Sequence, residues 1–95
     1  MRLLYLPPAR KYLKKIKDKR LRDECGEIIN ALLDDPTIGE RKRGDLNEVW
    51  TYNFRYVGTD YRIAYRFMLG ELGKLLIIMV GPHENFYNEL KRYLK

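Results

Sequence analysis

The stretch VWTYNFRYVGTDYRIAYRFMLGELGKLLIIMV, residues 49–80, decides the fold. Its first two segments, residues 49–56 and 61–68, alternate between apolar and polar side chains, which is typical of strands with one buried face. The side chains that share the apolar face are Trp50, Tyr52, Phe54, Tyr56, Tyr61, Ile63, Tyr65 and Phe67. Residues 74–80 form a continuous apolar run, as expected for a central strand covered on both sides. Turn signals, VGTD and LGELG, separate the three segments, so the stretch predicts three consecutive strands.

The segments on either side of this stretch add one strand and three helices. Residues 2–6, RLLYL, are apolar and compatible with a strand, and two prolines stop them. Residues 9–35 have helical periodicity, and the polar run KDKR within them predicts a break between two helices. Pro36 ends the second helix. Residues 84–95 have the spacing of a helix that lies on the sheet.

These elements predict an α+β fold in the order β-α-α-β-β-β-α. We expect an antiparallel four-stranded sheet with an N-terminal αα-hairpin and a C-terminal helix. A chain of 95 residues has room for one core, so residues 1–95 are expected to form a single domain. The face opposite the aromatic side chains is too polar for a core and is expected to meet water or a ligand. That face carries Thr51, Asn53, Arg55, Arg62 and Arg66.

The charge of the chain favours a polyanionic partner. It has 19 Lys and Arg against 13 Asp and Glu, a formal net charge of +6, and this excess suits RNA, DNA, an acidic protein segment or anionic lipid. The excess can also serve solubility alone. No apolar stretch approaches the ~20 residues of a membrane span, and the N-terminus does not resemble a signal peptide. We therefore expect a cytoplasmic protein without a membrane partner. Cys25 is the only cysteine, which excludes an internal disulfide.

Arg62 is the first candidate site residue. Side chains on adjacent antiparallel strands lie about 5 Å apart, so arginines on the polar face form a concentrated positive patch. The planar guanidinium group suits phosphate. Arg62 is central in its strand, and we expect it to have a functional role, whereas Arg66 is expected either to form an ion pair or to project into solvent. The alternative is that these arginines pair with Asp60 or Glu48.

His83 and Tyr87 are the next candidates. His83 is the only histidine and lies between the last strand and the last helix. A neutral imidazole exchanges protons near neutral pH, but a histidine here can also simply begin the helix. Tyr87 follows one helical turn later, so both side chains can point to one side. It can stack on a nucleobase, or it can belong to the core, for which Phe86 is the better candidate.

A basic loop and the absence of cofactor motifs complete the pattern. Arg41, Lys42 and Arg43 are expected to attract a nucleic-acid backbone without sequence preference. With scattered carboxylates and one histidine, the sequence predicts no metal site, and no glycine-rich phosphate loop is present. An enzyme of this kind would work without a cofactor. RNA cleavage fits, because the 2′-hydroxyl supplies the nucleophile and the protein supplies proton transfer and charge stabilisation.

The order of elements, the segment YRIAYRF and the closing segment VGPHENFYNELKRYL resemble the RelE/ParE toxin superfamily over essentially the whole chain. The resemblance implies a toxin of a type II toxin–antitoxin pair with a cognate antitoxin as partner. In the RelE branch it implies an mRNA endonuclease that enters the ribosomal A site and uses the 2′-hydroxyl. In the ParE branch it implies a non-catalytic inhibitor of DNA gyrase. An inactive homologue that only binds its antitoxin is the third alternative.

Position by position, the resemblance implies three catalytic residues. Arg62 matches the arginine that steadies the scissile phosphate. His83 matches the basic residue before the last helix, and Tyr87 matches a tyrosine that organises the nucleotide. RNA-binding roles are expected for six further residues: Thr51, Asn53, Arg55, Arg41, Lys42 and Arg43. Where RelE itself carries lysines, this chain has Thr51 and Asn53, which moves the expected proton transfer onto His83.

Overall fold

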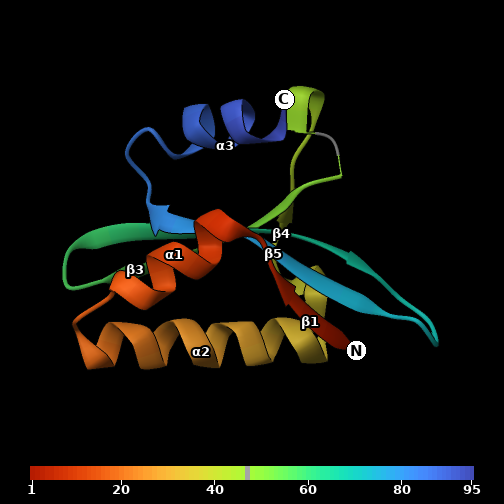
Figure 1. The fold of residues 1–95 in the computed structure, drawn as a ribbon, viewed down its shortest axis with the longest axis horizontal. Helices are drawn as coiled ribbons and strands as arrows, with labels where there is room; N and C mark the ends of the chain where they lie inside the picture. Colours follow the sequence, from red (N-terminus) through yellow and green to blue (C-terminus); the bar gives the residue numbers. More distant parts are fainter. Residues whose placement is uncertain (47) are drawn as a thin grey trace.

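The computed structural model describes residues 1–46 and 48–95 and consists of one sheet between two layers of helices (Figure 1). The strands are β1 (Arg2–Tyr5), β2 (Glu40–Arg41), β3 (Trp50–Tyr56), β4 (Thr59–Met68) and β5 (Lys74–Pro82). The helices are α1 (Pro7–Lys15), α2 (Lys19–Asp34) and α3 (Phe86–Leu94), with single 3₁₀ turns at Pro36–Ile38 and Gly44–Leu46. Among the described residues, no helix is long and apolar enough to cross a membrane.

The sheet is five-stranded and mixed, in the order β1-β5-β4-β3-β2. The predicted antiparallel meander of residues 49–80 is present as β3, β4 and β5. The prediction of four antiparallel strands is wrong in two respects. β1 pairs with β5 in parallel, although β5 is the last strand in the chain. In addition, β2 pairs with the outer edge of β3 through only two residues.

The αα-hairpin forms as predicted, with its break at residues 16–18. Asp18 caps α2, because its side chain accepts hydrogen bonds from the backbone N–H groups of Arg20 and Leu21 at 3.0 and 3.3 Å. The same carboxylate accepts a hydrogen bond from the hydroxyl of Tyr56 at 3.0 Å. Pro36 begins the 3₁₀ turn directly after α2. The hairpin is thus tied at its turn to the end of β3.

The two faces of the sheet carry separate cores. On one face, α1 and α2 pack on the aromatic and aliphatic residues that the sequence assigns to the buried side, among them Ile63 and Tyr65. On the other face, α3 places Phe86 and Leu90 over Ala64 and Met79. The helices therefore lie on both faces, as Figure 1 shows for α3 on one side and α2 on the other.

A bulge in β5 adjusts the sheet beneath α3. Ala64 pairs with Met79 and Tyr65 pairs with Ile77, so Ile78 is an extra residue on β5. Ile78 and Met79 both belong to the core under α3. A bulge bends its strand and re-aims side chains. Here it adds apolar surface for α3 just before β5 reaches the candidate site.

Candidate active site

Arg62 lies in the middle of a row of three residues across the sheet, with Asn53 on β3 and Gly81 on β5. Its Nε donates a hydrogen bond to Oδ1 of Asn53 at 3.2 Å. Its NH1 group donates to the carbonyl oxygen of His83 at 3.4 Å. The guanidinium thereby reaches the corner between β5 and α3.

Tyr87 lies in the first turn of α3 and is half-buried. Its ring packs edge-to-face on Phe86, with the ring centroids 5.8 Å apart. The Cζ atom of Arg62 lies 4.6 Å from the Tyr87 ring centroid, within the range of a cation–π interaction. Phe86 is the core residue of this pair, as the sequence indicates, and Tyr87 is held at the border between core and solvent.

His83 lies in the turn between β5 and α3, and its backbone fixes that turn. Its N–H donates to the carbonyl oxygen of Asp60 at 2.8 Å, and its carbonyl oxygen accepts from the N–H of Phe86 at 3.2 Å. The side chain is exposed. Among the residues that the structure describes, none hydrogen-bonds to the imidazole ring. The ring is therefore accessible to a ligand, while the backbone carbonyl of the same residue contacts Arg62.

Lys42 reaches the same ring from a different part of the chain. Its backbone N–H donates to the carbonyl oxygen of Val49 at 2.8 Å, and its Nζ lies 5.1 Å from the ring centroid of Tyr87. Nζ also pairs with Glu40 at 3.3 Å. Burial alone would lower the pKa of Lys42, but Tyr87 and Glu40 outweigh it and raise the pKa above its ordinary value. Lys42 is therefore a cation at neutral pH.

We call these five residues the corner cluster: Lys42, Asn53, Arg62, His83 and Tyr87. A polar hollow adjoins it, lined by Asn53, Phe54, Arg55, Asp60, Tyr61 and Arg62. Arg55 lies in this hollow and pairs with Asp60 at 3.5 Å, and both side chains are more than half exposed. Exposed pairs of this kind contribute little to stability and open readily to a ligand. The cluster and the hollow together form a continuous polar surface.

The structure does not place every predicted residue at this surface. Thr51 is 1% exposed, and its hydroxyl has no hydrogen-bond partner among the described residues. Thr51 is thereby set apart from the exposed residues of this surface, and its role in RNA binding stays a prediction. Arg41 and Arg43, on either side of Lys42, are exposed and take no part in the described contacts of the corner cluster.

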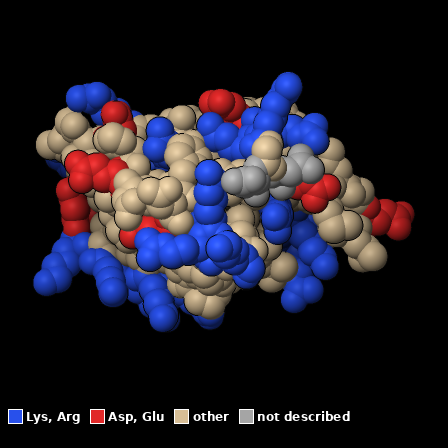
Figure 2. Space-filling model, turned by 90° about the horizontal axis from the view of Figure 1, so that it is seen from above, with Lys and Arg blue, Asp and Glu red and all other residues tan. Residues whose placement is uncertain are grey.

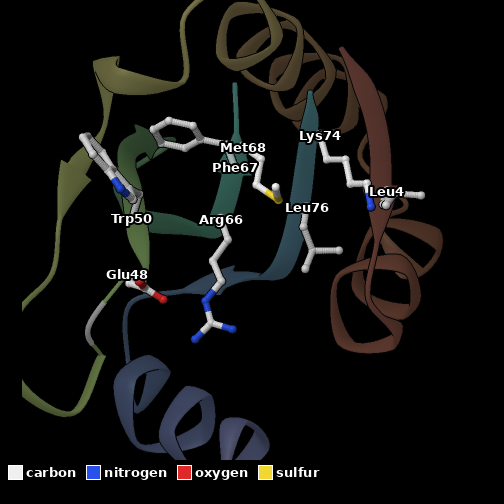
Figure 3. A pocket seen from close by; sticks show the side chains of 8 residues that line it. All are labelled: Leu4, Glu48, Trp50, Arg66, Phe67, Met68, Lys74 and Leu76. Atoms are coloured by element: carbon white, nitrogen blue, oxygen red, sulfur yellow. The ribbon is translucent and has the colours of Figure 1, made fainter. Parts of the chain in front are cut away.

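Arg66 lies away from the corner cluster, as part of a second hollow on the α3 side of the sheet (Figure 3). It is exposed, as predicted. The lining comes from β1, β3, β4, β5 and Glu48, and its apolar members are Leu4, Trp50, Phe67, Met68 and Leu76. Seen from the side of α3, Lys and Arg side chains are spread over much of the surface, with Asp and Glu at several places between them (Figure 2).

Sequence reasoning grouped Lys42 with its two basic neighbours and missed its contact with Tyr87. Lys42 lies in a loop, where the sequence has no periodic pattern that would indicate the direction of its side chain.

Across residues 1–46 and 48–95, no three His, Cys, Asp or Glu side chains come close enough to hold a metal ion. The groups that the corner cluster offers are two cations, one exposed imidazole and one aromatic ring. Such a set can bind a phosphodiester, stack a base and transfer a proton.

Comparison with solved structures shows that this fold is a known one. The chain is similar to the isolated Escherichia coli RelE toxin, with a TM-score of 0.68 and 22% identity over 97% of each chain. It is similar to a chain of the intact E. coli RelBE toxin–antitoxin complex, with a TM-score of 0.66 and 21% identity over 84% of this chain and 93% of that one. It is also similar to a chain of the RelBE2 toxin–antitoxin complex from Mycobacterium tuberculosis, with a TM-score of 0.64 and 24% identity over 86% and 96%. These likenesses show the RelE fold.

The sequence assigns the family. A model of the ParE-like toxins of type II bacterial toxin–antitoxin systems matches residues 3–91, so the chain belongs to this family. No curated protein sequence matches the chain. The resemblance to the RelE/ParE superfamily is thereby confirmed, and the chain is a toxin of a type II toxin–antitoxin system.

Proposed function

We propose that this toxin is a ribosome-dependent mRNA endonuclease that cleaves RNA by attack of a 2′-hydroxyl. The observation that carries the proposal is the position of Arg62. It hydrogen-bonds to the backbone of His83 and lies over the ring of Tyr87, so one guanidinium connects all three expected catalytic residues. These are the functions that metal-free RNA cleavage requires: phosphate binding, proton transfer and nucleotide positioning.

In the proposed reaction, the 2′-oxygen forms a bond to phosphorus while the bond from phosphorus to the 5′-oxygen breaks. His83 either takes up the proton of the 2′-hydroxyl or gives a proton to the leaving 5′-oxygen, and solvent exchanges the other proton. Arg62 stabilises the charge that develops on the non-bridging oxygens. Tyr87 stacks on the nucleotide next to the scissile bond. Arg55, Asn53 and the basic loop hold the strand.

We also propose that a cognate antitoxin with an acidic or amphipathic segment binds this toxin. The net charge of +6 and the exposed Lys and Arg side chains of the α3 side support it (Figure 2). Two of the similar structures are complexes of a toxin with its antitoxin.

The competing function is inhibition of DNA gyrase without catalysis. The match to ParE-like toxins favours it, as does the absence of lysines at Thr51 and Asn53. An inactive homologue that only binds an antitoxin would show neither activity.

A translation extract supplied with a reporter mRNA separates these functions. We expect wild-type protein to cut the mRNA, and Arg62→Ala and His83→Ala each to cut it roughly 100-fold more slowly. A parallel reaction with gyrase and plasmid DNA serves as the second arm. Accumulation of cleaved gyrase–DNA complexes with intact mRNA would decide for the ParE-like function, and inactivity in both arms for an inactive homologue.

A further inference from the structure

Lys42 and Arg62 approach one aromatic ring from different elements of the fold. The Nζ of Lys42 and the Cζ of Arg62 lie 5.1 and 4.6 Å from the ring centroid of Tyr87. One cation comes from the loop after β2 and the other from the middle of β4. Two cations near the same point repel each other, so their convergence is stabilised most by an anion that contacts both.

The acidic groups around this pair leave it positive. Among the described residues, the only ion pair of either cation is that of Lys42 with Glu40, whose side chain is 67% exposed. Arg62 donates to neutral oxygens, namely the amide of Asn53 and the carbonyl of His83. An exposed carboxylate on a two-residue edge strand is easily displaced.

Lys42 differs from the basic residues next to it. Its side chain is only 21% exposed, whereas Arg41 and Arg43 are exposed. The hydrogen bond from its backbone to Val49 fixes the loop at the point where the side chain turns inward. Because its pKa is raised, Lys42 remains charged and does not serve as a proton acceptor. Its chemistry is therefore that of a charge that binds an anion.

We propose that Lys42 is the second phosphate-binding cation of the site, contacting the same RNA backbone as Arg62 beside the ring of Tyr87. This proposal rests on the proposed function for its ligand class, a single-stranded phosphodiester. RelE carries lysines on the strand where this chain has the neutral residues Thr51 and Asn53. In this chain, Lys42 of the loop after β2 supplies the positive charge instead. Glu40 then acts as an internal anion that occupies Lys42 until the substrate phosphate replaces it.

The test measures binding separately from cleavage. The probe is a single-stranded deoxyoligonucleotide, which lacks the 2′-hydroxyl and cannot be cut by the proposed reaction. Each phosphate contact contributes about 0.7 to the slope of log affinity against log salt concentration. We expect Lys42→Met to lower this slope by about 0.7 and Lys42→Arg to retain it. Lys11→Met is the matched control, because it removes one exposed charge from α1 on the other face of the sheet and is expected to leave the slope unchanged.

Glu40→Gln is expected to change the affinity for the oligonucleotide in the opposite direction to Lys42→Met. Removal of the competing carboxylate is expected to tighten oligonucleotide binding several-fold in wild type and to have no such effect in the Lys42→Met background. In the translation extract, Lys42→Met is expected to slow mRNA cleavage roughly tenfold. Thermal melting of each variant shows that the fold is retained.

The results separate the two proposals. If Lys42→Met lowers the slope but wild type leaves mRNA intact, the phosphate contact stands and the endonuclease function fails. If wild type cuts mRNA and Lys42→Met has the slope and cleavage rate of wild type, the role of Lys42 is overturned. Equal losses of slope in Lys11→Met and Lys42→Met would also overturn it, because the effect would then be one of net charge.

Discussion

The side chain of Asn53 accepts a hydrogen bond from Nε of Arg62 at 3.2 Å, across the β3–β4 pair. Asn53 thereby fixes the direction of the guanidinium toward His83 and Tyr87. The interaction makes Asn53 a positioning residue as well as a candidate RNA contact. It also shows how a neutral side chain on β3 can serve the site.

Asn53→Ala is expected to reduce mRNA cleavage several-fold, because Arg62 loses the acceptor that orients it. Asn53 is exposed, so the free energy of unfolding should change by no more than about 0.5 kcal/mol. Cleavage in the translation extract and urea unfolding measure the two quantities. Asn53→Asp keeps an acceptor for Nε but adds a negative charge, so it should retain the orientation of Arg62 and weaken oligonucleotide binding. Wild-type cleavage by Asn53→Ala would show that the hydrogen bond has no functional role.

Two substitutions of Tyr87 distinguish base stacking on its ring from hydrogen bonding by its hydroxyl group. Tyr87→Phe keeps the ring over which Arg62 and Lys42 lie, whereas Tyr87→Ala removes it. Stacking of a base on an aromatic side chain is worth about 1–3 kcal/mol. We therefore expect Tyr87→Ala to weaken binding of the deoxyoligonucleotide by roughly tenfold or more, and Tyr87→Phe to bind within about twofold of wild type. Equal losses in both variants would assign the contribution to the hydroxyl group instead.

The faces of β3 and β4 could be predicted from the sequence because alternation with a period of two depends only on local geometry. Asn53, Arg55 and Arg62 lie on the polar face as predicted, and Ile63 and Tyr65 on the buried one. The parallel pairing of β1 with β5 could not be predicted, since no local pattern specifies which distant strand a short apolar segment joins. Thr51 is buried although it lies on the polar face, because burial depends on which elements pack there, and the alternation along β3 does not specify them.

The site could be predicted only in part for the same reason. Arg62, His83 and Tyr87 come from adjacent elements, and their proximity follows from the order of β4, β5 and α3. Lys42 comes from a loop, where direction depends on a backbone hydrogen bond to Val49 and on space beside Tyr87. The run of three basic residues at 41–43 predicts neither this hydrogen bond nor this space.

Asp18 gives the fold a dependence on pH. The hydrogen bond from Tyr56, followed by those from the α2 backbone, lowers the pKa of this carboxyl below its ordinary value of 3.8. A lowered pKa in the folded state stabilises the fold above the unfolded-state pKa and loses that stabilisation as the pH falls through the folded-state pKa. Asp18→Ala is therefore expected to melt at a lower temperature than wild type at pH 7, with a smaller difference below about pH 3.8. Thermal melting across this range measures it, and a difference that does not change with pH would contradict it.

Tyr65 ties the sheet to the turn after α2. Its side chain is fully buried, and its hydroxyl donates to the carbonyl oxygen of Pro36 at 2.7 Å. Burial raises the pKa of Tyr65 to about 12, so the hydroxyl keeps its proton at neutral pH. Tyr65→Phe leaves that carbonyl unpaired and is expected to cost about 1–3 kcal/mol in the free energy of unfolding. Tyr52→Phe, at a half-buried position, is the control, and an equal effect of both substitutions would contradict the role of the hydrogen bond.

The central claim is that this toxin uses the 2′-hydroxyl of mRNA in a metal-free cut made at the corner cluster. The most direct test maps cleavage of a reporter mRNA in a translation extract, with and without a single 2′-deoxy nucleotide on the 5′ side of the mapped cut. We predict that the deoxy substitution abolishes the cut at that position alone, and that EDTA-treated protein cuts the unmodified mRNA as well as untreated protein does. An unchanged cut at the deoxy position, or no ribosome-dependent cut in either mRNA, would contradict the account.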